Sequence, residues 1–115
     1  SHMAAQLAEQ ECKPCKGDVP PLEGDALQEK YRELDSDWSL IEEKKLEKEF
    51  SFDDYPSAVQ FTDKVAAIAQ AQDHHPDLLL TYGKVKVTVW THKIGGLSDS
   101  DFVFAAKAEK AYQEM

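Results

Sequence analysis

Residues 78–90 have the sequence LLLTYGKVKVTVW, and this segment sets the architecture of the chain. Val85, Val87 and Val89 alternate with Lys86 and Thr88, which is the two-residue period of a strand with one buried face. The run from Leu78 to Tyr82 is a second strand candidate, and Gly83 marks the turn between the two. Because so short a connection leaves no room for a crossover helix, the segment predicts an antiparallel hairpin.

A second hairpin is predicted upstream, between residues 38 and 52. Its first strand is indicated by three apolar residues, Trp38, Leu40 and Ile41. Its second strand carries apolar residues on one side, at Leu46, Phe50 and Phe52. The other side of that strand is polar, and Glu42 to Lys45 supply the turn. Two hairpins predict a four-stranded antiparallel sheet.

Helices are predicted before, between and after the hairpins. The first covers residues 26–35, with Asp25 as its N-cap. The second begins at residues 53–56 and ends near Asp73, because Pro76 disfavours the helical conformation in the residue before it. Its apolar stripe consists of Ala58, Phe61, Val65, Ile68 and Ala69.

The last helix is predicted from Asp99 to Gln113, where Ser98 and Asp101 have the spacing of a capping box. The order of elements is therefore α-β-β-α-β-β-α. It predicts an α+β fold in which a four-stranded antiparallel sheet is backed on one face by helices.

One domain is expected, over residues 25–115. Residues 1–3 (Ser-His-Met) are typical of an expression-tag scar, and residues 4–24 predict an irregular N-terminal arm. The arm holds the only two cysteines, Cys12 and Cys15, in a Cys-x-x-Cys pattern. The pattern lacks the strand and helix of a redox site, so disorder or a facultative disulfide is favoured over half of a zinc site.

The charge balance excludes several partners. The chain has 13 Lys plus Arg against 22 Asp plus Glu, a net charge of −9. Such an acidic surface disfavours nucleic acid and anionic membranes, and no apolar run approaches the length that spans a bilayer. Two cysteines are too few to stabilise a fold by disulfide bonds, and this favours a protein of the reducing cytoplasm.

Apart from His2, the histidines are His74, His75 and His92, all beside predicted element ends. Imidazole suits proton transfer at neutral pH. The first two are equally consistent with stabilising the end of a helix, and a three-histidine zinc site is a further alternative. The spacing alone does not choose among these readings.

These residues form a larger pattern. It consists of Asp73-His74-His75-Pro76, Tyr82-Gly83-Lys84-Val85 and Thr91 to Ser98, followed by Asp101. Upstream stand Trp38 and the Phe50 to Tyr55 segment. Over about residues 21–112 the chain resembles the pterin-4a-carbinolamine dehydratases, whose α+β architecture agrees with the order derived above. One departure is Gln70, at a position where several members carry Glu.

The resemblance implies a cofactor-independent hydro-lyase that removes water from 4a-hydroxytetrahydropterin in tetrahydrobiopterin recycling. The implied catalytic residues are His74, His75 and His92, with no metal. The implied substrate-binding residues are Asp73, Trp90, Thr91, Trp38 and Asp101. Trp38 is also consistent with a core position, and Asp101 with helix capping.

The resemblance also implies partners. These are a pterin substrate, a second or further copy of the chain in a homodimer or homotetramer, and a functional link to an aromatic amino acid hydroxylase. The alternative function is a non-enzymatic interaction or assembly module of the same fold. A zinc-dependent hydrolase ranks last.

Overall fold

The computed structural model describes residues 2–13, 17, 19–34 and 37–115. Its sheet contains four antiparallel strands in the order β1-β2-β4-β3. The strands are β1 (Ser39–Ile41), β2 (Lys45–Ser51), β3 (Asp77–Thr81) and β4 (Lys84–Val89). The helices are α1 (His2–Glu9), α2 (Gly24–Leu34), α3 (Tyr55–Gln72), the short 3-10 helix η1 (His92–Ile94) and α4 (Asp99–Gln113). The predicted α+β fold and its order of elements are confirmed.

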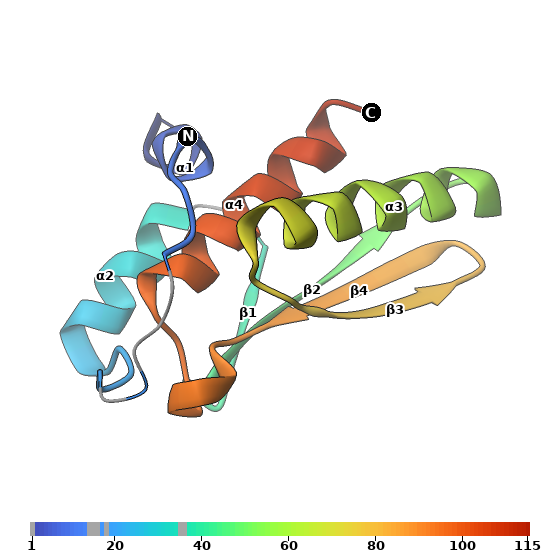
Figure 1. Cartoon of the computed structure of the whole chain (residues 1–115). Helices are drawn as coiled ribbons and strands as arrows, with labels where there is room; N and C mark the ends of the chain where they lie inside the picture. Colours follow the sequence, from blue (N-terminus) through green and yellow to red (C-terminus); the bar gives the residue numbers. More distant parts are fainter. Residues whose placement is uncertain (1, 14–16, 18, 35–36) are drawn as a thin grey trace.

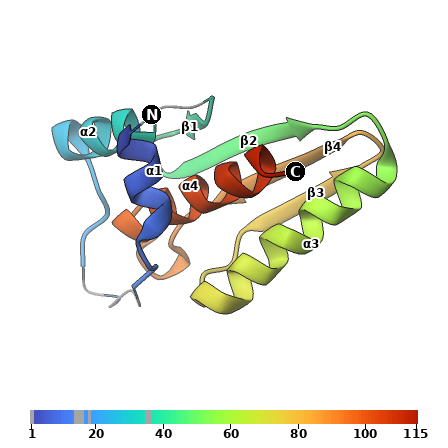
Figure 2. The same ribbon diagram turned by 90° about the horizontal axis from the view of Figure 1, so that it is seen from above.

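The helices lie on one side of the sheet, where α3 and α4 cover the inner face (Figures 1 and 2). Strand alternation explains this arrangement, because Val85, Val87 and Val89 all point inward and are fully buried. The pairing places Leu46 opposite Val89 and Phe50 opposite Val85 on the same face. Helices α3 and α4 contribute the buried apolar residues Ala58, Phe61, Val65, Ala69, Phe102, Val103, Phe104, Ala105, Ala106 and Ala108.

Helix α3 begins and ends with side chains and backbone conformations suited to those positions. The carboxylate of Asp54, the N-cap, accepts a hydrogen bond from the backbone N–H of Ser57 at 2.8 Å, and Pro56 lies in the first turn. At the other end Asp73 adopts a left-handed conformation, with φ of 51°. This residue turns the chain out of the helix toward β3.

The N-cap of α3 gives a prediction on stability. Hydrogen bonds from Ser57 lower the pKa of Asp54, so the folded protein favours the ionised carboxylate. This contribution is present above the unfolded pKa of about 4 and is lost as the pH falls through the lower folded pKa. We expect Asp54→Ala to lower the melting temperature by a few degrees at pH 7, with the difference disappearing toward pH 2. A thermal melt monitored by circular dichroism at both pH values checks this, and a pH-independent difference contradicts it.

The structure corrects the expected arm. Residues 4–24 were expected to be irregular, but residues 4–9 belong to α1. The cause is tertiary packing, because Leu7 and Ala8 are buried, and the ammonium group of Lys107 in α4 donates to the carbonyl of Ala8 at 2.8 Å. Two buried residues in a short segment are too few to reveal a helical period. Cys15, the second cysteine of the Cys-x-x-Cys pattern, lies outside the described residues, so its predicted disorder or facultative disulfide stays a prediction.

Other differences from the expected elements are small. Helix α2 begins at Gly24, which places Asp25 in its first turn instead of at the N-cap. The expected loop after β4 contains η1. Among the residues that the structure describes, no helix is long and apolar enough to cross a membrane.

Candidate active site

Three stretches of chain meet at one hollow of about 360 Å³, which we call the histidine pocket. Six of the predicted site residues line it, namely Asp73, His74, His75, Trp90, Thr91 and His92. Lys13 and Lys93 complete the lining. The volume lies in the range of small-molecule sites.

The β3–β4 hairpin explains why residues so far apart in sequence meet. Its register pairs Asp77 with Thr88. Continuing that register by three residues on each strand brings 77 − 3 = 74 opposite 88 + 3 = 91. The histidines that precede β3 therefore lie beside the residues that follow β4. Pro76 and the left-handed Asp73 end α3 at this point.

Asp101 lies beneath the pocket and is completely buried. Its Oδ1 atom is 2.6 Å from Nε2 of His74. Its Oδ2 atom accepts from the hydroxyl of Thr91 at 2.7 Å and from the backbone N–H of Ser98 at 2.9 Å. Both oxygens are thus engaged, which satisfies a carboxylate that is out of contact with water.

This network determines which nitrogen of His74 is free. Because the Asp101 carboxylate only accepts hydrogen bonds, Nε2 of His74 carries the hydrogen, and Nδ1 of the neutral ring keeps its lone pair. The ring lies 5.9 Å from that of Phe104, and the side chain is only 13% exposed. His74 is therefore held in one orientation, and in its neutral form the nitrogen without a hydrogen is Nδ1.

His92 is held differently, by aromatic stacking. Its ring lies 4.3 Å from the ring of Trp90, with an angle of 4° between the planes. The ammonium group of Lys45 lies 4.0 Å from the centre of the Trp90 ring, a cation–π contact. His92 is exposed, so its ring exchanges protons directly with water. His75 and Asp73 are exposed at the same pocket.

Two predicted substrate-binding residues do not line the histidine pocket. Trp38 is 2% exposed and packs in the core, with its ring 5.8 Å from that of Phe50. This position does not support the expectation that Trp38 binds substrate. It supports the alternative, a place in the core. Asp101 reaches the pocket only through His74 and Thr91.

Asp101 also caps α4, since Ser98 and Asp101 form both hydrogen bonds of a capping box. Capping and a role at the site appeared as alternatives in the sequence. In the structure one carboxylate has both roles. Its Oδ2 atom accepts the capping hydrogen bond from Ser98, and its Oδ1 atom is bonded to His74.

Lys13 and Lys93 are not among the site residues predicted from the sequence. Lys13 comes from a segment without periodic pattern, and Lys93 is one of many surface lysines. In the described part of the chain, no three His, Cys, Asp or Glu side chains gather as the ligands of a metal ion. The zinc-hydrolase alternative therefore has no ligand set there.

Comparison with known proteins shows the family of the chain. Residues 20–111 match the family described as pterin 4 alpha carbinolamine dehydratase. Relatives assigned to that family include one from Alkaliphilus metalliredigens, 45% identical over 94% of this chain and 97% of its own. Another, from Rubrobacter xylanophilus, is 45% identical over 92% of this chain and 98% of its own.

Among solved structures, a transcriptional coactivator/pterin dehydratase from Brucella melitensis has a TM-score of 0.72 and 29% identity. The match covers 79% of this chain and 97% of that one. The family match spans both hairpins, α3, most of α4 and all three histidines of the pocket. The chain belongs to the pterin 4 alpha carbinolamine dehydratase family.

Proposed function

We propose that this protein removes water from 4a-hydroxytetrahydropterin, with His74 as the base and His92 as the acid. The hydro-lyase class follows from family membership. The observation that carries the residue assignment is the convergence of His74, His75 and His92 on one hollow, with His74 bonded to a buried carboxylate.

The reaction needs two proton transfers and no change of oxidation state. The bond between C4a and its hydroxyl breaks, and the hydroxyl leaves as water once it has received a proton. A ring nitrogen loses a proton, and its electron pair forms the new double bond to C4a. One group on the enzyme gives a proton and another takes one, so the proton count of the enzyme is unchanged overall.

The base role suits His74. The Asp101 carboxylate holds Nε2–H, leaves Nδ1 free, and stabilises the imidazolium that forms when Nδ1 accepts a proton. Asp101 is then a positioning residue, in place of the substrate-binding role expected from the sequence.

The acid role suits His92. Its exposed ring recovers a proton from water after each turnover, and stacking on Trp90 fixes its plane. His75, Asp73, Trp90 and Thr91 are left to bind and orient the pterin ring.

The direct test is a stopped-flow assay of 4a-hydroxytetrahydropterin breakdown. We expect the protein to accelerate the reaction well above the rate in buffer. The control variant Lys64→Ala, at an exposed position on α3, should have the same rate as the unchanged protein. A rate equal to that of buffer contradicts the proposal. Homodimer or homotetramer formation and a functional link to a hydroxylase stay predictions.

The alternative, an interaction or assembly module, draws support from the coactivator description of the Brucella melitensis protein. A module of that kind has no physical need for three histidines that meet at one hollow. The dehydratase proposal therefore takes precedence.

A further inference from the structure

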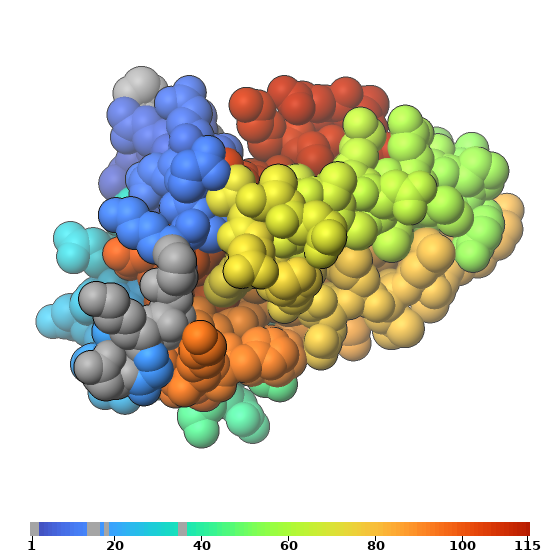
Figure 3. Space-filling model, viewed as in Figure 1, coloured from blue at the N-terminus to red at the C-terminus, as the bar shows by residue number. Residues whose placement is uncertain are grey.

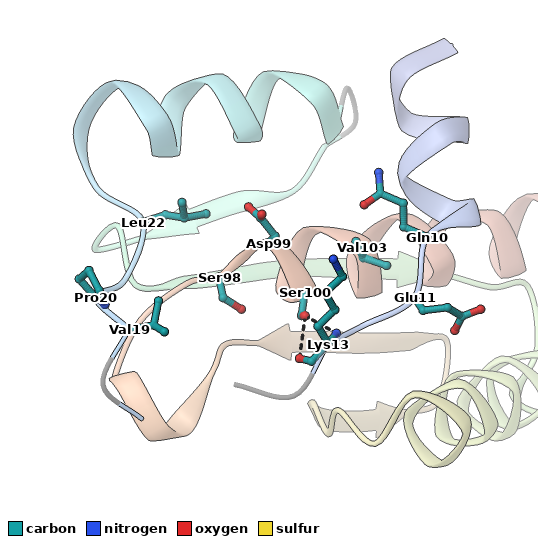
Figure 4. A pocket seen from close by; sticks show the side chains of 10 residues that line it. All are labelled: Gln10, Glu11, Lys13, Val19, Pro20, Leu22, Ser98, Asp99, Ser100 and Val103. Carbon is teal, nitrogen blue, oxygen red and sulfur yellow. Dashed lines mark hydrogen bonds between the residues drawn. The ribbon is translucent and has the colours of Figure 1, made fainter. Parts of the chain in front are cut away.

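A second hollow adjoins the histidine pocket, between the N-terminal segment and the start of α4 (Figure 4). We call it the arm pocket; its volume is about 350 Å³. Its apolar lining comes from Val19, Pro20, Leu22 and Val103. Nothing in the acid–base chemistry described above uses this space.

The wall of the arm pocket is formed by residues 10–13, which are fixed to the body of the fold. The backbone N–H of Lys13 donates to Oγ of Ser100 at 2.8 Å, and that hydroxyl lies 3.1 Å from the carbonyl of Lys13 (Figure 4). The backbone N–H of Cys12 donates to the side chain of Gln72 at 2.7 Å. Residues 12 and 13 are thus bonded to the end of α3 and the start of α4. Figure 3 shows the N-terminal part of the chain, in blue, against the end of α3, in yellow.

Cys12 serves the same attachment. Its thiol donates to the carbonyl of Ser100 at 3.4 Å. Burial raises the pKa of this thiol to about 11, so it stays protonated and remains a donor at neutral pH. This half-buried cysteine is a structural anchor for the segment that carries Lys13.

The two pockets are neighbours that share one lining residue. Lys13 lines both of them, so it stands at their boundary. The hydroxyls of Thr91, in the histidine pocket, and Ser98, in the arm pocket, are 2.8 Å apart. Both residues bind the same oxygen of Asp101. A molecule seated over the histidines therefore has the arm pocket on the other side of Lys13.

The lining of the arm pocket selects among possible occupants. Val19 leaves 48% of its surface exposed, an apolar residue open to a ligand. Lys13 offers a donor for a carbonyl oxygen, whereas Glu11 and Asp99 repel a tail with several negative charges. An uncharged substituent with an apolar ring and a carbonyl group fits this combination.

We propose that the arm pocket binds the C6 substituent of the pterin, and that it favours an arylaminomethyl group ending in an amide. This inference rests on the proposed function, because it places the pterin ring over the histidines. Lys13 then donates to the amide carbonyl, and Val19, Pro20 and Leu22 contact the aryl ring. The N-terminal segment is on this reading a specificity element of the site.

The test measures binding of unreactive, oxidised pterins by quenching of Trp90 fluorescence, since Trp90 lines the histidine pocket. The two probes are 6-methylpterin and a pterin with a 4-carbamoylanilinomethyl group at C6. We expect the aryl amide to bind about tenfold more tightly, from burial of its ring. Val19→Ser should weaken its binding about threefold and leave 6-methylpterin unaffected. Lys13→Ala, which changes both pockets, should weaken binding of the aryl amide more than that of 6-methylpterin.

Matched controls are Met115→Ser, whose side chain is 46% exposed at the other end of the chain, and Lys64→Ala. Both should keep the tenfold preference. Equal affinity of the two pterins, or equal losses in the site variants and the controls, overturns the arm pocket as a subsite. Stopped-flow dehydration separates this from the proposed function, since active protein without the preference refutes only the subsite.

Discussion

His74→Ala and His92→Ala should each lower kcat/KM for dehydration of 4a-hydroxytetrahydropterin by about 10² to 10⁴. The two transfers act on different atoms of the substrate, so neither imidazole can replace the other. A carboxylate or a water molecule left at the site is a poor substitute at neutral pH, because imidazole is the side chain whose unperturbed pKa lies near 7.

The two variants should differ in stability. His92 is exposed, and its loss removes a stacking contact with Trp90 alone. His74→Ala leaves Oδ1 of the buried Asp101 without its partner, which costs about 1–3 kcal/mol. Chemical denaturation should therefore show a lower midpoint for His74→Ala and an almost unchanged midpoint for His92→Ala.

A rescue experiment separates lost chemistry from lost structure. Added imidazole should restore part of the activity of His92→Ala, because the vacated position is open to solvent. It should restore less in His74→Ala, where the ring is mostly buried. His75→Ala, at the same pocket, should mainly raise KM. Unchanged rates in both alanine variants contradict the assignment of the acid and the base.

The sheet and the long helices could be predicted because each has a periodic pattern of apolar residues that extends over most of the element. Val85, Val87 and Val89 define the inner face of β4, and their partners Leu46 and Phe50 follow from the same rule on β2. Helix α4 was predicted with its actual bounds, since Ser98 and Asp101 mark its start. Helix α1 was missed because its burial depends on α4, which no local pattern reveals.

The convergence of the histidines also follows from local information. A hairpin with a tight turn returns the chain to its starting point, so residues before β3 must meet residues after β4. The position of Lys13 does not follow in this way, because it depends on hydrogen bonds to Ser100, 87 positions away. Trp38 shows the opposite problem: an aromatic residue beside a strand fits both a core and a site until the packing is known.

Asp101→Asn should lower kcat by about 10² or more while leaving the stability of the fold almost unchanged. The amide is nearly isosteric with the carboxylate, but it offers one acceptor and one donor. Two hydrogens point at the position of Oδ2, from Thr91 and the backbone of Ser98, so the amide oxygen takes that position. The amide NH₂ group then faces Nε2 of His74, which must become an acceptor.

This exchange moves the His74 hydrogen from Nε2 to Nδ1, and the lone pair needed to accept a substrate proton is lost. Thr91→Val is the comparison, because it removes one donor to Oδ2 and leaves the bond between Oδ1 and His74 in place. It should therefore keep the original tautomer and lower kcat much less, although KM rises if Thr91 contacts the pterin. Nitrogen-15 NMR of the His74 ring distinguishes the tautomers directly. A ring that keeps its hydrogen on Nε2 in Asp101→Asn would refute the positioning role, whereas a purely structural role for Asp101 predicts a loss of stability without a change of tautomer.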